Sequence, residues 1–307
     1  MLYGDQNVDL NSDSRPSLQR VMEKLLLEMV LYLFQGNGER IMAERTDPTQ
    51  KTNHPFYCQY MAVYEYATQY VEANQLLDIG CGEGYGAYLL AQHAKEVHAI
   101  DKHKKTIQKA QQKYSLPNLS FIVEDVKKLS KHTLHTFDVV CCFHVIEHLK
   151  EPSSLLVDIR RLLSKSGILL ISTPNRYSHF RRTTGMEWPF HEREYSVNEF
   201  RELLSVHFNN VELYTLHTSE NVQKFQDIRA RYVQQIFRWD ILKLRQWLPK
   251  RVLQFSFDVG GKLLKSIVSI NNHDLMYGIT VSDFQITDKQ LNQGLDLIGI
   301  CRVPLNS

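Results

Sequence analysis

The stretch LLDIGCGEGYGAYLLA, residues 76–91, joins a short apolar segment to a cluster of glycines and then to a segment of helical pattern. Gly80, Gly82, Gly84 and Gly86 fall within seven consecutive positions. Glycine adopts positive φ without strain, and it lets a ligand approach the backbone because it has no Cβ. A strand that ends in such a turn and continues as a helix is typical of the ligand-binding edge of a doubly wound sheet. The stretch therefore predicts an α/β fold with a ligand at this turn.

Strand and helix patterns alternate along the chain beyond this stretch. The predicted strands are apolar runs at 76–80, 96–100, 119–123, 137–143, 167–172, 211–216 and 295–303. The predicted helices cover 56–72 and 197–206, and others begin near Gly84, Lys104 and Ser153. Apolar strands that alternate with helices form a sheet covered on both faces. We therefore expect a doubly wound, mostly parallel, seven-stranded sheet.

The overall composition excludes several other classes of protein. The 307 residues carry 36 basic and 34 acidic side chains, a formal net charge of +2, and 43% are hydrophobic. These proportions argue against long disorder and against a nucleic-acid binder of high net charge. No apolar run approaches the roughly 18 residues of a membrane span, and the N-terminus shows no signal-peptide pattern. Five scattered cysteines without a CxxC pair favour reduced thiols, so we expect a cytoplasmic protein.

Two kinds of ligand suit the glycine turn. Gly82, Gly84 and Ala87 fit the pattern G-x-G-x-x-A, and Asp101 follows at the spacing expected for a ribose contact. This pattern predicts a dinucleotide and an NAD(P)-dependent oxidoreductase, for example one acting on a nucleotide sugar. Asp78 precedes the glycines and gives D-x-G-x-G-x-G instead. A carboxylate there would repel a pyrophosphate but would orient a ligand that carries an ammonium group.

On that second pattern the chain resembles the class I S-adenosylmethionine-dependent methyltransferases, which have a Rossmann-like fold. The resemblance continues at VHAID (97–101), FIVEDV (121–126), FDVVCCFHVIEHL (137–149) and LLSKSGILLISTPNR (162–176). It implies S-adenosylmethionine as the cofactor and S-adenosylhomocysteine as the product. The positions that match the family's cofactor contacts are Asp78, Gly80, Cys81, Gly82, Gly84, Asp101, Lys102, Asp125, Val126 and His144.

The resemblance also implies a role for each acidic position. Asp78 would help to orient the amino-acid portion of the cofactor, Asp101 would bind both ribose hydroxyls, and Asp125 would contact the adenine amino group. Asp125 has a second explanation, because its side chain can also cap a short helical turn at 127–129. The sequence leaves these two roles of Asp125 open.

A polar group follows the predicted strand 137–143. His144, Glu147 and His148 stand at i, i+3 and i+4, which places them on one side of a helical turn. His191 lies in a second polar segment, PFHEREYSVNEF, where Ser196 and Glu199 form a predicted capping box. Our first hypothesis is that His148 or His191 acts as a general base on the acceptor and that Glu147 supports them.

Two other hypotheses concern the same group. In one, His144, Glu147, His148 and His191 bind a divalent metal ion that activates the acceptor. Small-RNA terminal methyltransferases and some quinone-biosynthesis methyltransferases, which this stretch resembles, use a Glu-x-x-Glu-His turn in that way. Here His144 replaces the first glutamate, which removes an oxygen ligand. In the other hypothesis, the same histidines and Glu147 do not touch the substrate. They only orient the loop by pairing with Arg176 or Arg193.

The chain is predicted to hold one sheet with two additions. We expect an N-terminal helical cover at 1–55, the cofactor-binding core at 56–217, a basic helical insertion at 218–294 and the last strand at 295–307. Residues 221–270 carry ten Lys or Arg and three Asp, and 223–248 has the pattern of an amphipathic helix. Four explanations of the insertion remain open. It could be a helical hairpin packed on the core, a lid, a homodimer contact, or a surface for an anionic or membrane-bound partner.

Two further segments, QGNGERIMAE (35–44) and MYGITVSDFQI (276–286), resemble a bacterial branch of type 11 methyltransferases associated with surface polymers. In that branch the N-terminal helix would cover the cofactor, and Glu39 and Arg40 would reach the substrate pocket. We therefore expect methylation of an oxygen, in preference to a nitrogen or carbon, of a small molecule, a glycan or a lipid-linked acceptor, with nucleic acid disfavoured. The alternatives are the oxidoreductase above and a non-catalytic binding protein on the same fold.

Overall fold

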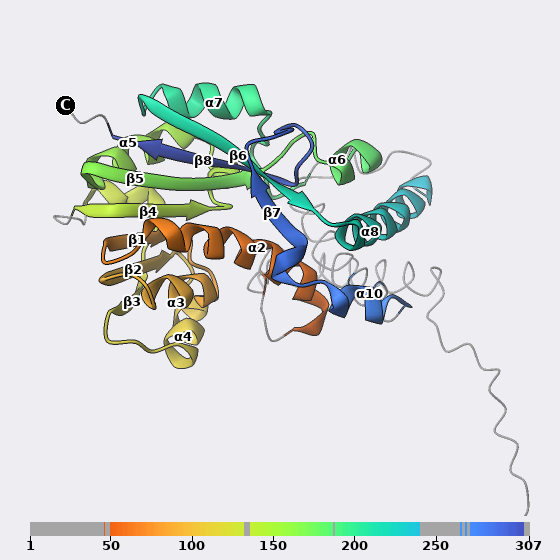
Figure 1. Cartoon of the computed structure of the whole chain (residues 1–307), viewed down its shortest axis with the longest axis horizontal. Helices are drawn as coiled ribbons and strands as arrows, with labels where there is room; N and C mark the ends of the chain where they lie inside the picture. Colours follow the sequence, from red (N-terminus) through yellow and green to blue (C-terminus); the bar gives the residue numbers. More distant parts are fainter. Residues whose placement is uncertain are drawn as a thin grey trace, which may run out of the picture.

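The computed structural model describes residues 50–131, 136–186, 188–239 and 271–303, together with Thr46, Lys265 and Val268. Its centre is a single sheet of eight strands in the order β3-β2-β1-β4-β5-β8-β6-β7 (Figure 1). The strands are β1 Gln75–Ile79, β2 Glu96–Asp101, β3 Leu119–Val123, β4 Phe137–Phe143, β5 Leu163–Pro174, β6 Asn210–Thr218, β7 Phe284–Thr287 and β8 Asp296–Arg302.

The sheet is doubly wound, as expected. Strands β3, β2, β1, β4 and β5 are parallel neighbours, and the chain changes direction along the sheet between β1 and β4. Strand β8 is antiparallel to both β5 and β6. Ligands bind at the carboxyl ends of the strands next to such a change of direction. The fold class predicted from the sequence is therefore confirmed.

The helices cover both faces of the sheet (Figure 1). They are α2 His54–Ala67, α3 Tyr85–Ala91, α4 Lys104–Lys113, α5 Pro152–Leu162, α6 His179–Thr184, α7 Val197–Ser205, α8 Glu220–Trp239 and α10 His273–Gly278. Short 3-10 turns are η1 Lys51–Asn53, η2 Thr68–Tyr70, η3 Val126–Lys131, η4 Ile146–His148 and η6 Val281–Asp283. Helices α2, α3 and α4 lie on one face, and α5 and α7 lie on the other (Figure 1).

Alternating side chains of each central strand pack into two different cores. In β1, Leu76 belongs to the core beneath α2 and α3, whereas Leu77 and Ile79 belong to the core beneath α5 and α7. All three are almost completely buried. Because successive residues of a strand point to opposite faces, a strand buried on both faces is mostly apolar, with Asp78 as the buried polar exception in β1. This burial explains why the strands appear in the sequence as mostly apolar runs.

The sheet has one strand more than the seven that we expected. The additional strand β7 pairs antiparallel with the end of β6, from Thr215 to Thr218. It lies within 218–294, so this insertion is not helical throughout. Its four residues, FQIT, contain two apolar residues, Phe284 and Ile286, and of these only Phe284 is buried. A strand this short at an edge carries too few apolar residues to be recognised by periodicity alone.

Several local predictions are confirmed, and others fall outside the described residues. The capping box at Ser196 and Glu199 is present at the start of α7, and α8 occupies the first part of the predicted amphipathic helix. All five cysteines are buried and free of disulfide bonds. The cover at 1–45, with Glu39 and Arg40, and the insertion at 240–264 lie outside the described residues. Within the described part, no helix is both long and apolar enough to span a membrane.

Candidate active site

A cavity of about 530 Å³ lies at the carboxyl ends of the parallel strands. Its walls include residues 80–83 after β1, 101–103 after β2, 125–127 after β3, and 143–145 and 147–149 after β4. Cavities of this size are typical of small-molecule and cofactor sites. All the predicted cofactor residues line this cavity except Asp78 and Gly84, and so do His148, His191 and Glu147.

The glycine turn after β1 has the backbone that the sequence predicts. Gly80 and Gly84 have φ of +77° and +82°, a region that favours glycine. A Cβ at Gly80 would lie 2.4 Å from Cγ2 of Val145, and a Cβ at Gly84 would lie 2.8 Å from Cβ of Ala110. The turn therefore has no room for a side chain at Gly80 or Gly84, and its backbone forms part of the cavity wall. Gly84 contributes through packing behind that wall.

Two acidic residues line the cavity after β2 and β3. The Oδ1 atom of Asp101 accepts a hydrogen bond from the backbone N–H of His103 at 2.8 Å, which fixes the carboxylate at the end of β2. Oδ1 of Asp125 accepts one from the backbone N–H of Lys127 at 3.0 Å, at the start of η3. Asp125 therefore caps a turn and lines the cavity at the same time. Its two predicted roles are compatible.

Asp78 lies behind the cavity wall rather than on it. Its carboxylate is completely buried and accepts a hydrogen bond from the hydroxyl of Tyr64 at 3.2 Å. Burial raises the pKa of Asp78 to about 7, Tyr64 opposes this, and the charge of Asp101 adds to it. Tyr64 itself lines the cavity. Asp78 can therefore act on a bound cofactor through Tyr64. Its own carboxylate does not reach the cavity.

His144 forms a buried charged group with two carboxylates. Its Nδ1 lies 3.5 Å from Oε1 of Glu147, and its Nε2 lies 3.3 Å from Oδ2 of Asp296. Burial alone would lower the pKa of His144, but Asp296 and Glu147 raise it to about 10. Burial raises the pKa of Glu147, but the contact with His144 outweighs this and lowers it to about 2. At neutral pH the group is an imidazolium between two carboxylates.

Neighbouring side chains hold this charged group in place. Gln59 on α2 donates to Asp296 at 2.8 Å, Thr173 on β5 donates to Glu147 at 3.3 Å, and the ring of Tyr60 lies edge-on to His144. The sequence reasoning missed Asp296, which opens the last strand. The sequence does contain a signal for Asp296, because it is an acidic residue at the start of an otherwise apolar run. That end of the strand lies at the edge of the sheet where the site is.

His148 and His191 approach each other across the cavity wall. Their ring centroids lie 5.0 Å apart, and a ligand atom from each of Glu147, His148 and His191 lies within 4.8 Å of the others. Nδ1 of His148 contacts the backbone oxygen of Phe190 at 3.2 Å. The structure thus brings together three of the four residues predicted as metal ligands. It places His144 with Asp296 and Glu147 instead.

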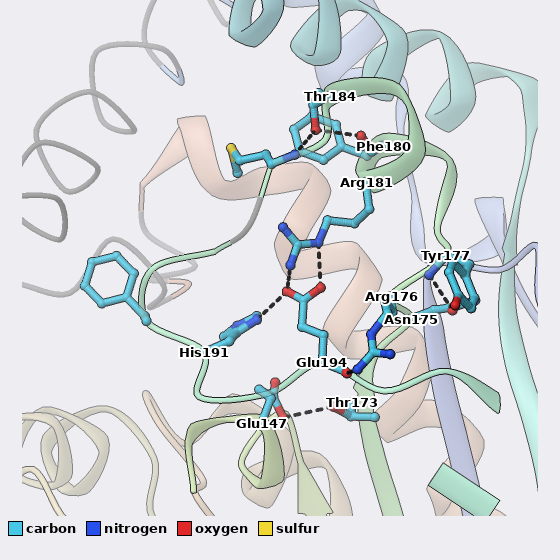
Figure 2. A network of polar contacts seen from close by, with 12 residues as sticks. Glu147, Thr173, Asn175, Arg176, Tyr177, Phe180, Arg181, Thr184, His191 and Glu194 are labelled. Carbon is cyan, nitrogen blue, oxygen red and sulfur yellow. Dashed lines mark hydrogen bonds and ion pairs between the residues drawn. The ribbon is translucent and has the colours of Figure 1, made fainter. Parts of the chain in front are cut away.

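His191 belongs to a polar network with Glu194 and Arg181 (Figure 2). Its Nδ1 lies 2.7 Å from Oε1 of Glu194, and Arg181 on α6 donates from Nε to Oε2 of the same carboxylate at 2.6 Å. Burial raises the pKa of Glu194, but the contacts with His191 and Arg181 leave it below its usual value. Sequence reasoning missed Glu194 and Arg181, because no motif marks either position.

Arg176 and Arg193 do not pair with the histidines or with Glu147. Both side chains bind Glu199 on α7, at 2.8 Å and 3.2 Å, so the third hypothesis is wrong about these partners. Backbone hydrogen bonds, rather than these arginine side chains, connect the loop that carries His191 to the turn η4. The N–H groups of Glu192 and Arg193 both donate to the carbonyl oxygen of Glu147. This tie explains how His191 is brought next to His148.

Comparison with known proteins gives the family. The chain matches the family model described as "Methyltransferase domain" over residues 71–229. A "Probable S-adenosylmethionine-dependent methyltransferase" of Mycobacterium tuberculosis (strain CDC 1551 / Oshkosh) is 27% identical over 272 residues, 86% of this chain and 89% of that protein. A "Ubiquinone biosynthesis O-methyltransferase" of Albidiferax ferrireducens is 29% identical over 158 residues, 48% of this chain and 63% of that protein.

A solved structure shows the same fold. The "[4+2]-Cyclase SpnF" superposes with a TM-score of 0.50 at 16% identity, and covers 95% of this chain and 98% of that chain. The site fits the cofactor of the family, since a side-chain-free turn at Gly80 and a fixed carboxylate at Asp101 face one cavity. The oxidoreductase alternative is set aside. The chain belongs to the methyltransferase domain family and is a class I S-adenosylmethionine-dependent methyltransferase.

Proposed function

We propose that this methyltransferase acts on an oxygen atom of a small molecule or of a glycan or other surface-polymer intermediate. The observation that carries the proposal is the convergence of His148, His191 and Glu147 on the cavity that the glycine turn also lines. A weakly acidic hydroxyl needs a base to accept its proton during methyl transfer, and imidazole suits that task near neutral pH. The ubiquinone O-methyltransferase relative supports oxygen as the acceptor atom.

The cofactor side is assigned to residues after β1, β2 and β3. Gly80, Cys81 and Gly82 present backbone to the amino-acid portion, and Asp101 accepts hydrogen bonds from the two ribose hydroxyls. Asp125 and Val126 lie where the adenine would bind, with Lys102 beside the ribose. Asp78 supports this side from behind, through Tyr64. When bound, S-adenosylmethionine supplies an electrophilic methyl group on a sulfonium.

His148 is assigned as the general base. Because Nδ1 faces the carbonyl oxygen of Phe190, that nitrogen carries the ring hydrogen and Nε2 of the neutral ring carries the lone pair. The acceptor oxygen would take the methyl group that the bound cofactor supplies, and the electron pair of the carbon–sulfur bond would remain on sulfur. The hydroxyl proton passes to Nε2 of His148. His191, held by Glu194, is placed to orient the same hydroxyl.

One observation favours a metal ion as the second candidate. Glu147, His148 and His191 offer one oxygen and two imidazole nitrogens, a set suited to zinc or another transition metal rather than to magnesium. The contact between His191 and Glu194 matches the carboxylate that supports a metal-bound histidine in many sites. In this alternative the three residues hold an ion that lowers the pKa of the acceptor hydroxyl.

The test measures cofactor binding and methyl transfer separately. Calorimetry with S-adenosylhomocysteine follows binding, and mass spectrometry follows methylation in a panel of phenols, catechols and saccharides. His148→Ala should keep wild-type affinity for S-adenosylhomocysteine and lower kcat about 10²–10⁴-fold. The control is His93→Ala, an exposed histidine outside the cavity. Full activity in His148→Ala would contradict the base, and activity lost to a chelator and restored by zinc would favour the metal.

The cofactor assignment has its own test. Asp101→Ala removes a carboxylate that would accept two hydrogen bonds, so binding of S-adenosylhomocysteine should weaken by about 1–3 kcal/mol. Glu96→Ala, at the exposed start of the same strand, is the control. Equal affinity of wild type and Asp101→Ala would remove the ribose assignment. Tight binding of NADH in place of S-adenosylhomocysteine would overturn the whole cofactor side.

A further inference from the structure

Arg229 on α8 is a cation in the cavity wall that the methyl-transfer mechanism does not use. Its guanidinium carbon lies 4.6 Å from the ring centroids of both Phe56 and Phe180, and 5.7 Å from that of Phe225. Nη1 donates one hydrogen bond, to Oε1 of Gln226 at 2.8 Å. Throughout the described part of the chain, no carboxylate lies within ion-pair distance of Arg229.

This environment is unfavourable for an isolated cation. Burial lowers the pKa of Arg229 to about 10, so the side chain remains charged at neutral pH. Aromatic faces recover part of the lost hydration energy, but they do not satisfy the N–H donors of a guanidinium. Arg229 is partly buried, and a charge withdrawn from water is ordinarily paired with an opposite charge. The arrangement therefore lacks an anion, and the open side of Arg229 is the cavity.

Two further cations lie on the same wall. Arg181 binds Glu194 through Nε and Nη2, whereas its Nη1 is buried and, as far as the described residues extend, has no hydrogen-bond partner. The Nζ of Lys265 lies 5.0 Å from the centroid of the Phe56 ring, the same ring that Arg229 contacts. We call Arg181, Arg229 and Lys265 the cationic wall.

The cationic wall lies on the acceptor side of the cavity. Arg181 and Arg229 are carried by α6 and α8, which pack together beside β6 and away from the ends of β2 and β3 (Figure 1). Arg181 is linked to His191 through Glu194, as Figure 2 shows. Apolar side chains of Phe180, Met186 and Trp188 adjoin it and line the same cavity. An acceptor bound near His191 would therefore meet both a cation and an apolar surface.

From this juxtaposition we propose that the methyl acceptor is an anion, whose carboxylate or phosphate binds Arg229, with the charge of Arg181 on the same wall, while an apolar portion lies against Phe180, Met186 and Trp188. The inference rests on the proposed function, because it assigns the acceptor of the same site. A guanidinium matches the planar geometry of a carboxylate and the oxygens of a phosphate in paired hydrogen bonds. Neutral polyols lack the charge that the wall requires.

The test uses simple aromatic probes on the protein loaded with S-adenosylhomocysteine. Benzoate and phenyl phosphate represent the two oxyanions, and benzyl alcohol is the neutral probe. Titrations followed by ligand-observed NMR should give at least about tenfold tighter binding for one oxyanion than for benzyl alcohol, and the preferred probe distinguishes carboxylate from phosphate. Arg229→Gln should weaken the oxyanion about tenfold or more, and Arg229→Lys should weaken it less. The control is Arg231→Gln, an exposed arginine on the same helix.

Three outcomes would overturn the inference. Benzyl alcohol could bind as tightly as both oxyanions, or Arg229→Gln and Arg181→Gln could bind the oxyanions like wild type. Alternatively, Arg229→Gln could weaken S-adenosylhomocysteine itself, which would assign the cation to the carboxylate of the cofactor. Unchanged binding of S-adenosylhomocysteine in each variant also shows that the variant is folded. A wild-type protein that binds no S-adenosylhomocysteine would contradict the proposed function instead, so the two failures are distinguishable.

Discussion

Asp78 on the cofactor side and Glu147 on the acceptor side are two buried carboxylates with opposite electrostatics. Their exposed fractions are 0% and 1%. Asp78 lies within β1, and Glu147 lies in the turn η4 that follows the neighbouring strand β4. Burial raises the pKa of both. The pKa of Asp78 nevertheless lies at about 7 and that of Glu147 at about 2. Equal burial therefore does not lead to equal charge.

The partner of each carboxylate decides the difference. Asp78 receives a hydrogen bond from the neutral hydroxyl of Tyr64 and feels the negative charge of Asp101. Glu147 lies against the imidazolium of His144, with the hydroxyl of Thr173 as a further donor. An opposite charge offsets desolvation, whereas a hydroxyl offsets only part of it. Glu147 is thus compensated by a cation within the protein, whereas Asp78 has no cationic partner in the described part of the chain.

The largest expected effect is a change in the free energy of unfolding with pH, caused by Asp78 on the cofactor side. Because the pKa of Asp78 is raised from 3.8 to about 7, the folded state holds a proton that the unfolded state has lost between these values. Asp78 therefore makes no unfavourable contribution below pH 3.8, and stability falls as the pH rises from about 3.8 to about 7 and then levels off. The whole change corresponds to about 4 kcal/mol. Urea denaturation from pH 4 to 8 should show this fall in wild type and not in Asp78→Asn.

Tyr64→Phe provides the companion measurement. Losing the hydroxyl raises the pKa of Asp78 further, so the fall in stability should extend to higher pH than in wild type. If Asp78→Asn showed the same decline between pH 4 and 8 as wild type, Asp78 would not be the group that titrates. The contrast with Glu147 would then have no basis in charge.

A somewhat smaller effect is expected on the acceptor side, with the opposite pH dependence. The pKa of Glu147 is lowered from 4.5 to about 2, so its stabilising contribution is present above pH 4.5 and is lost as the pH falls towards 2. Glu147→Gln should lower the free energy of unfolding at pH 7 by about 3 kcal/mol. This is the low end for breaking a buried ion pair, because Asp296 still faces His144.

The matched control is an ion pair of similar chemistry on the surface. Glu212 pairs with Arg302 where both side chains are more than a third exposed, so Glu212→Gln should cost at most about 1 kcal/mol. Equal losses in Glu147→Gln and Glu212→Gln would show that burial adds nothing to the pair. That outcome would remove the electrostatic distinction between the two sides of the cavity.

The two sides also differ in how much of them the sequence reveals. Cofactor-side residues such as Gly80 and Asp101 lie at the end of a strand or directly after it, within the short motifs that also predict the strand. The order of strands places these ends along one edge of the sheet, so contiguous sequence is sufficient. Most of the fold was predictable for the same reason, since apolar runs buried on both faces are visible without tertiary information.

The acceptor side depends on contacts between distant parts of the chain. His144 meets Asp296 from the last strand, and Arg229 from α8 stacks on Phe56 of α2. No spacing in the sequence encodes such contacts, which depend on how loops and helices pack. Sequence alone predicted His144 as a cofactor contact and metal ligand. Its ion pairs with Asp296 and Glu147 could not be foreseen, because they depend on how distant segments pack. The strand β7 was missed because its partner β6 is far away in the sequence.

The smallest expected effect tests how firmly the acceptor-side loop is held. Ser196 caps α7 directly after the segment that carries His191 and Glu194, and its Oγ accepts from the N–H of Glu199 at 3.3 Å. Ser196→Ala removes that bond and the one that the hydroxyl donates to Oε2 of Glu199 at 2.7 Å, but it leaves the backbone N–H of residue 196 to donate to the same carboxylate. Stability should therefore fall by only about 1 kcal/mol. Ser205→Ala, at the exposed end of the same helix, is the control.

The informative measurements on Ser196→Ala are kcat and the affinity for S-adenosylhomocysteine, each compared with wild type. The loop has anchors besides the cap, because Glu192 and Arg193 donate backbone hydrogen bonds to Glu147, and Arg181 holds Glu194. With those anchors intact, kcat and the affinity for S-adenosylhomocysteine should both stay within about twofold of wild type. A loss of kcat at unchanged affinity would show that the acceptor side, unlike the glycine turn, depends on a single helix cap for its geometry.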